Sequence, residues 1–150
     1  MTGPTKAAIP DAEREIEREL IALVRRARRD SREHARLVHP ELQAAGYGVL
    51  VTVAKHQPTR ACELVRLLEL DKGAVSRQVS QLEQLGLVER LPDPSDGRVQ
   101  TLSLSPAGEE RMAAVRRRWH SEFRGRLTSW APEQLAGFAE DLRRYNASPG

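Results

Sequence analysis

Four polar side chains in the middle of the chain have the types and spacing to form hydrogen bonds with the edges of DNA bases. They are Ser76, Arg77, Ser80 and Gln81. Arginine and glutamine can bond in pairs to guanine and adenine in a major groove, and serine can bond to either base. Lys72, just before them, carries a charge suited to a phosphate. The chemistry indicated is recognition of a nucleic acid.

A helix over residues 72–85 would present these side chains on one face. Asp71 is the expected N-cap, and Gly86 is expected to end the helix. One side then carries an apolar stripe of Val75, Val79, Leu82 and Leu85, and the other carries Gly73, Ser76, Arg77, Ser80, Gln81 and Gln84. This pattern also describes any solvated surface helix, and on polarity alone that alternative stays open.

A shorter helix is expected immediately before, with Thr59 as its cap. Its apolar residues recur at helical spacing, and they are Ala61, Leu64, Val65 and Leu68. Two short apolar segments follow residue 86 and predict two strands; they contain Leu87, Val88 and Leu91, then Val99, Leu102 and Leu104. Helix, turn, helix and ribbon together predict a winged helix-turn-helix.

The Pro- and Gly-rich loop 92–98 between the strands is the predicted wing, with Arg98 at its tip. We expect Asp96 to orient the guanidinium of Arg98 by a charge-assisted contact, so that the arginine could enter a minor groove. A plain surface hairpin with an incidental ion pair is the alternative. Arg90 fits two roles equally well, as a phosphate contact or as a structural partner of Asp96.

The flanking segments 11–39 and 106–146 predict amphipathic helices. Their apolar residues include Ile16, Leu23, Trp119, Phe123 and Phe138, and a winged module of residues 47–105 is too small to bury all these faces. The fold class expected is mainly α with a small β-wing, flanked by N- and C-terminal dimerisation helices, and the simplest account is a homodimer. A monomer whose terminal helices pack on one another is the alternative.

Composition excludes several functions. No segment approaches the ~20 apolar residues of a membrane-spanning helix, and the N-terminus lacks a secretory signal, so a cytoplasmic protein without membrane contact is expected. Aromatic residues make up 4% of the chain, which disfavours base stacking on single strands. The net charge of +3 is low, so only the placement of the basic residues favours DNA. No catalytic motif is present, and an enzyme is not expected.

The stretch Tyr47 to Glu110 resembles the MarR family of bacterial transcriptional regulators. The tract DKGAVSRQVSQLEQLGLVER is similar to the family's recognition helix and first wing strand, DPSDGR to its wing with an Asp-x-Arg signature, and LSLSPAG to the exit from the wing. Where the family often has Thr-x-x-Gly, this chain has Ser105-Pro106-Ala107-Gly108, and Ser105 can still cap the next helix.

The resemblance implies a homodimer that binds double-stranded DNA at a pseudo-palindromic operator, by default as a repressor, with half-sites about 10 base pairs apart. The expected DNA contacts are Lys72, Ser76, Arg77, Ser80, Gln81, Arg90, Asp96 and Arg98. A winged module that binds another protein without specific DNA binding is the alternative function.

The resemblance also implies release of DNA by a small aromatic or phenolic effector. Residues expected to line its pocket are His34, Leu37, Val38, Tyr47, Leu50 and Met112. Cys62 lies on the first helix of the motif, away from the N-terminal helix that carries the cysteine of peroxide-sensing members, and is expected to be a small buried core residue. The four histidines show no metal-binding spacing, and no cofactor or metal is expected.

Overall fold

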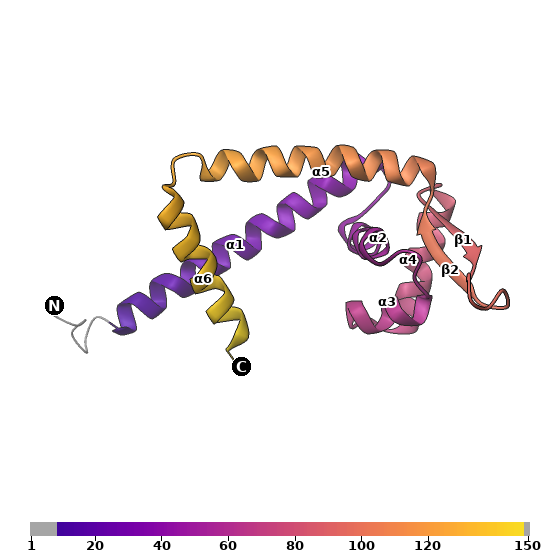
Figure 1. The fold of residues 1–150 in the computed structure, drawn as a ribbon, viewed down its shortest axis with the longest axis horizontal. Helices are drawn as coiled ribbons and strands as arrows, with labels where there is room; N and C mark the ends of the chain where they lie inside the picture. The colour runs from indigo at the N-terminus through magenta and orange to yellow at the C-terminus, as the bar shows by residue number, and fades with distance from the viewer. Residues whose placement is uncertain (1–8, 149–150) are drawn as a thin grey trace. The chain divides into compact units, whose positions relative to one another are not determined.

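The computed structural model describes residues 9–148, which contain six helices and one two-stranded sheet (Figure 1). The expectation that no secretory signal is present concerns in part residues 1–8, which lie outside the described residues. The chain divides into two compact units, Met1–Met112 and Ala113–Gly150. None of the helices in the described range has the length and apolar content required to cross a membrane.

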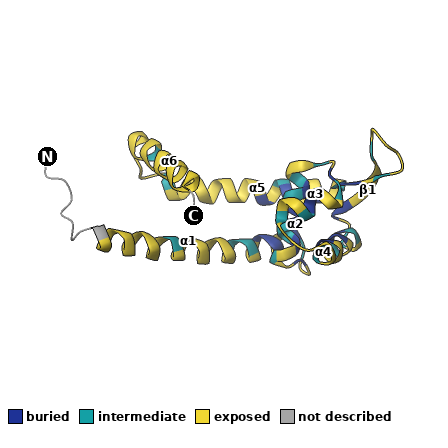
Figure 2. Ribbon diagram, turned by 90° about the horizontal axis from the view of Figure 1, so that it is seen from below, coloured by how far each residue is buried: buried dark blue, intermediate teal, exposed yellow. Residues whose placement is uncertain are grey.

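Helix α1, Ile9–Val38, is the long N-terminal helix that the sequence predicted. It ends two residues before Pro40, whose ring is incompatible with a helix interior. Only its last turns are buried, through His34, Ala35 and Val38. Its N-terminal two thirds is coloured almost entirely as exposed in Figure 2. The apolar residues Ile16, Leu23 and Val24 in this part of the helix are about half exposed.

Helix α2, Ala44–His56, is the central core helix of the first unit. Val49, Leu50 and Val53 on this helix have at most 1% of their surface exposed. Helix α2 packs against α1, α3, α4 and β2, so it lies at the centre of the core of the first unit.

Helix α3, Ala61–Leu68, begins at a different residue from the one predicted. The N-cap is Arg60 and not Thr59, because the backbone of Thr59 is already paired with Leu102 of the sheet (N–H to O 3.0 Å, and 2.7 Å in return). The Thr59 hydroxyl instead donates to the carboxylate of Glu63 at 3.0 Å. Leu64 alone on this helix is fully buried.

Helix α4, Lys72–Gln84, begins at the predicted residue and ends one residue before the predicted end, with Leu85 as a half-buried C-cap. The carboxylate of Asp71 accepts a hydrogen bond from the backbone amide of Ala74 at 2.8 Å, a cap that typically contributes about 1 kcal/mol. Val75, Val79 and Leu82 are buried. Gly86 follows with a φ of 70°, a left-handed conformation that glycine adopts without strain.

The wing is an antiparallel pair of strands, β1 (Val88–Pro92) and β2 (Gln100–Leu104). Its register pairs Val88 with Leu104 and Pro92 with Gln100. The inner end is apolar, with Leu102 and Leu104 at most 5% exposed, whereas β1 is exposed beyond Val88. The wing therefore rests on the core at its base and extends into solvent at its tip.

Helix α5, Pro106–Leu127, begins in the first unit and continues into the second, which ends with α6, Pro132–Ala147. Ser105 caps α5 as predicted, accepting from the backbone amide of Gly108 at 3.0 Å. Within the second unit, Trp119 stacks on Phe123 with ring centroids 5.1 Å apart, and Trp130 lies 5.4 Å from Phe138. All four aromatic side chains are between 39% and 45% exposed.

Candidate nucleic-acid interface

The polar face of α4 is open to solvent. Lys72, Ser76, Arg77 and Ser80 are all exposed, on the side opposite the buried apolar stripe. Gln81 is only half-buried among them, because its side-chain amide donates to the backbone carbonyl of Glu41 at 3.3 Å. Four of the predicted base and phosphate contacts are thus available on one helix face, and Gln81 lies at the margin of that face.

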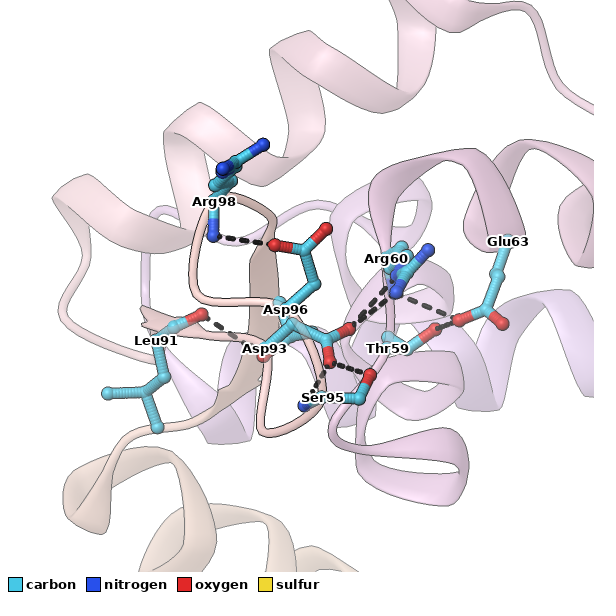
Figure 3. A network of polar contacts seen from close by, with 9 residues as sticks. Thr59, Arg60, Glu63, Leu91, Asp93, Ser95, Asp96 and Arg98 are labelled. Carbon is cyan, nitrogen blue, oxygen red and sulfur yellow. Dashed lines mark hydrogen bonds and ion pairs between the residues drawn. The ribbon is translucent and has the colours of Figure 1, made fainter.

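The predicted ion pair at the wing tip is replaced by a backbone contact. The carboxylate of Asp96 accepts from the backbone amide of Arg98 at 3.1 Å and not from its guanidinium, which extends away from the Asp96 carboxylate (Figure 3). An acid two residues before a turn residue readily forms such a local bond to the backbone. Asp96 therefore shapes the turn, and the charge of Arg98 stays exposed.

A second acid of the wing, Asp93, accepts four hydrogen bonds through its carboxylate, and sequence reasoning did not identify its role. One oxygen, Oδ2, accepts from Nε and Nη2 of Arg60 at 3.0 and 2.8 Å, and Oδ1 accepts from the amide and hydroxyl of Ser95 at 2.8 and 2.6 Å (Figure 3). The Asp93 side chain is only 10% exposed. The pattern Asp-Pro-Ser is a local turn signal, but the partner of Asp93 lies 33 residues away.

These contacts shift the pKa values of the groups involved. The hydroxyl and amide of Ser95, followed by Arg60, lower the pKa of Asp93 far below its usual range. The hydrogen bond to Asp93 raises the pKa of Arg60. The pKa of Glu63 is lowered by the backbone amide of Arg60, 2.9 Å from its carboxylate, and by the hydroxyl of Thr59. All three groups are therefore charged at neutral pH.

Arg90 has a structural partner, but a different one from the residue expected. Its Nε donates to the carboxylate of Glu83 on α4 at 2.8 Å, and not to Asp96. The two acids differ in position: Glu83 is the penultimate residue of α4, close to the start of β1, whereas Asp96 lies in the loop at the tip of the wing. The Arg90 side chain remains 43% exposed, so a phosphate contact is still open to it.

The residues predicted to line a ligand pocket are mostly core residues of the first unit. Val38, Leu50 and Met112 are buried, and His34 is 6% exposed with its ring 5.9 Å from that of Tyr47. Leu37 departs from this group, since it is 45% exposed. Across residues 9–148, no three His, Cys, Asp or Glu side chains come together in a way that could hold a metal ion.

Cys62 is exposed, which corrects the prediction of a buried core residue. It lies two residues before Leu64 on α3, and two residues correspond to about 200° around a helix. Because Leu64 points to the core, Cys62 points to solvent. The helix is short and buries one narrow stripe, so apolar content alone could not indicate which residues line it.

Comparisons with known proteins agree with this geometry. A model of the MarR family matches residues 42–99. The chain is 30% identical over 131 residues to the uncharacterised HTH-type transcriptional regulator YxaD of Bacillus subtilis (strain 168), which covers 87% of this chain and 90% of that protein. RV1404 of Mycobacterium tuberculosis is similar in structure, with a TM-score of 0.73 at 23% identity over 100% of this chain and 98% of that one. FabT of Streptococcus pneumoniae, solved in complex with DNA, has a TM-score of 0.77 at 17% identity over 89% and 94% of the two chains.

Proposed function

The chain belongs to the MarR family of transcriptional regulators, and from that premise we propose that it is a homodimeric repressor that binds a specific, pseudo-palindromic operator. Members of this family are DNA-binding proteins and not enzymes, in agreement with the prediction made from the sequence. The observation that carries the proposal is the exposed polar face of α4 in the same module as an exposed wing arginine, Arg98.

In the proposed complex, α4 enters the major groove. Ser76, Arg77 and Ser80 meet base edges or phosphates, and Lys72 at the helix start neutralises a phosphate. Gln81 would first have to release the carbonyl of Glu41, a weak contact at 3.3 Å. Arg98 enters the minor groove, where its guanidinium is attracted by the negative potential. Arg90 contacts a phosphate with the donors that Glu83 does not use.

The proposed dimer is supported by apolar side chains that a single chain leaves exposed. On α1 these are Ile16, Ile21, Leu23 and Val24, and in the second unit they are Trp119, Phe123, Trp130, Phe138 and Leu142. Large exposed apolar patches usually mark interfaces. Residues 11–39 and 106–146 are therefore assigned to dimerisation and 47–105 to DNA binding. Two recognition helices related by a twofold axis would require half-sites about 10 base pairs apart.

We also propose that a small aromatic or phenolic effector releases the DNA. The candidate lining remains His34, Leu37, Val38, Tyr47, Leu50 and Met112. Within this group the rings of His34 and Tyr47 form a tilted pair, and a planar ligand that entered the group would pack against aromatic side chains. A regulator of this kind would act in the cytoplasm, where the chromosome is accessible.

Binding of fluorescently labelled duplexes would test the proposal. The purified protein is titrated onto the DNA upstream of its own gene and onto a duplex of the same composition in scrambled order, from 50 to 200 mM salt. We expect selective binding of one dimer per site that weakens by about 10³-fold or more over this range. Equal binding to both duplexes, or none, would reject specific DNA binding and favour a module that binds another protein through a less salt-sensitive interface.

A further inference from the structure

We propose that Arg60 is a positioning residue for DNA binding by the wing. Arg60 belongs neither to the recognition helix nor to the wing, but at the start of α3 it holds Asp93 and thereby orders the loop that carries Arg98. The inference rests on the proposed function, because the property it explains is the contact of the wing with DNA. We call the contact between Arg60 and Asp93 the wing latch.

The wing requires such a support because an isolated two-stranded hairpin is only marginally stable in water. The described residues attach the wing to the helices at three levels. At the base, the side chain of Gln57 accepts from the amide of Leu104 at 2.8 Å. At the middle of the strands, where Arg90 faces Leu102, Thr59 pairs with Leu102 and Arg90 bonds to Glu83. At the third level, the wing latch holds the residue that follows β1. The latch alone among these three reaches the loop beyond the strands.

The latch connects to Arg98 through three hydrogen bonds, two between backbone groups and one from a backbone amide to a carboxylate. The amide of Asp93 donates to the carbonyl of Val99 at 2.8 Å, and the amide of Val99 donates to the carbonyl of Asp96 at 2.9 Å. The carboxylate of Asp96 then accepts from the amide of Arg98 at 3.1 Å. A displacement of Asp93 would therefore alter the turn from which the Arg98 side chain projects (Figure 3).

The geometry of the latch suits a positioning role. The two donors of Arg60 share Oδ2 of Asp93, while Ser95 occupies Oδ1, so the carboxylate is held from both sides. The backbone of Arg60 is itself held by Glu63 at 2.9 Å. A loop ordered before binding loses less conformational entropy on the DNA, and this raises affinity without any new contact.

The substitution Asp93→Asn distinguishes a role of the latch in positioning the wing from an effect of net charge on DNA binding. This substitution removes a negative charge from a protein that binds a polyanion, so electrostatics alone would strengthen DNA binding. If the latch positions the wing, the variant should instead bind the duplex selected by the parent about tenfold more weakly, the scale of one lost DNA contact. Circular dichroism of each variant verifies that the fold is retained.

A double-mutant cycle then links the latch to Arg98. Arg60→Gln and Arg98→Ala should each weaken binding about tenfold, and the double variant should be little weaker than either single one, because both remove the same contact. Arg60→Lys should restore part of the loss, since an ammonium can still reach one carboxylate oxygen. Arg66→Gln is the matched control, an equal loss of charge at an exposed position of the same helix.

A measurement without DNA keeps the two proposals separate. Trypsin cleavage after Arg98 in the free protein should be faster in Asp93→Asn than in the parent, because the wing loop opens more often. The latch proposal would be overturned if the cleavage rate were unchanged. It would also be overturned if the loss of DNA affinity in the double variant equalled the product of the losses in the two single variants. Faster cleavage together with a parent protein that selects no duplex would leave the latch in place and reject the proposed function.

Discussion

Arg77 presents an exposed guanidinium from the second turn of α4, on the face that we assign to the major groove. Arg77→Ala should weaken operator binding by about 1–3 kcal/mol and relax sequence preference, because a bidentate base contact carries both affinity and discrimination. Fluorescence anisotropy with the operator and a scrambled duplex measures both effects.

Lys72→Ala is the matched comparison for Arg77→Ala. Lys72 is expected to contact only a phosphate, so its loss should weaken binding to the two duplexes equally and reduce the salt dependence by about one phosphate contact. If Arg77→Ala behaved as Lys72→Ala does, or as the parent does, Arg77 would not read a base.

Cys62 is the residue whose environment departs most from the sequence-based expectation, since it is exposed on α3. We expect one thiol per chain to react with the chromogenic disulfide DTNB in the native protein without prior unfolding. Cys62→Ser should change the free energy of unfolding by less than about 0.5 kcal/mol, because an exposed side chain contributes little packing. Reaction only in denaturant would mean that another surface covers the thiol.

At the scale of elements, the wing latch determines how the contact between α3 and the wing responds to pH. Because the pKa of Asp93 is lowered on folding, the ionised carboxylate stabilises the folded protein at every pH above its unfolded value of about 3.9. That contribution to stability is lost only as the pH falls below the pKa of Asp93 in the unfolded chain and through its lower pKa in the folded protein.

The corresponding prediction compares the parent with Asp93→Asn by urea unfolding at a series of pH values. The difference in unfolding free energy should be constant from pH 8 to pH 5 and should shrink below about pH 4. A difference that changed above pH 5 would assign the effect to another group.

The junction between the wing and α5 depends on a glycine. A Cβ on Gly108 would overlap the backbone carbonyl of Leu87, so Gly108→Ala should destabilise the protein by about 1–3 kcal/mol. Gly125 lies later on the same helix and has open space where a Cβ would be, so Gly125→Ala should stabilise the protein by about 0.5–1 kcal/mol. Chemical denaturation of both variants tests the two signs, and equal effects would contradict the close approach at Gly108.

At the scale of the whole molecule, the exposed aromatic residues of the second unit lead us to expect self-association. Trp119 and Phe123 are stacked nearly parallel, at 9°, and are 41% and 44% exposed. Large aromatic side chains dominate the energetics of interfaces, and truncation of two such anchors typically costs about 4 kcal/mol in all. Replacing both with serine should therefore raise the dimer dissociation constant by about 1,000-fold.

Sedimentation velocity over a concentration series measures this shift. Arg66→Gln is the control, because Arg66 is an exposed residue of α3 and lies outside the segments assigned to dimerisation. It should leave the dissociation constant unchanged. A parent protein that sediments as a monomer at every concentration would reject the dimer and, with it, the twofold operator.

The sequence by itself determined the features that depend on neighbouring residues. The cap at Asp71, the buried stripe of α4, the stop at Gly86 and the cap at Ser105 were all predicted and confirmed, because each is specified within a few positions along the chain. The two wing strands follow from the same local alternation.

Only the tertiary structure decided which distant groups meet. The backbone of Thr59 pairs with Leu102 of the sheet, so the N-cap of α3 is Arg60 and not Thr59. The side chain of Arg60 bonds to Asp93, 33 residues away. Arg90 bonds to Glu83 and Cys62 faces solvent for the same reason, namely the way in which the helices dock on α2 and on each other. Spacing determines which face of an element a residue occupies, but the partner on that face is selected by packing between elements, which no local pattern records.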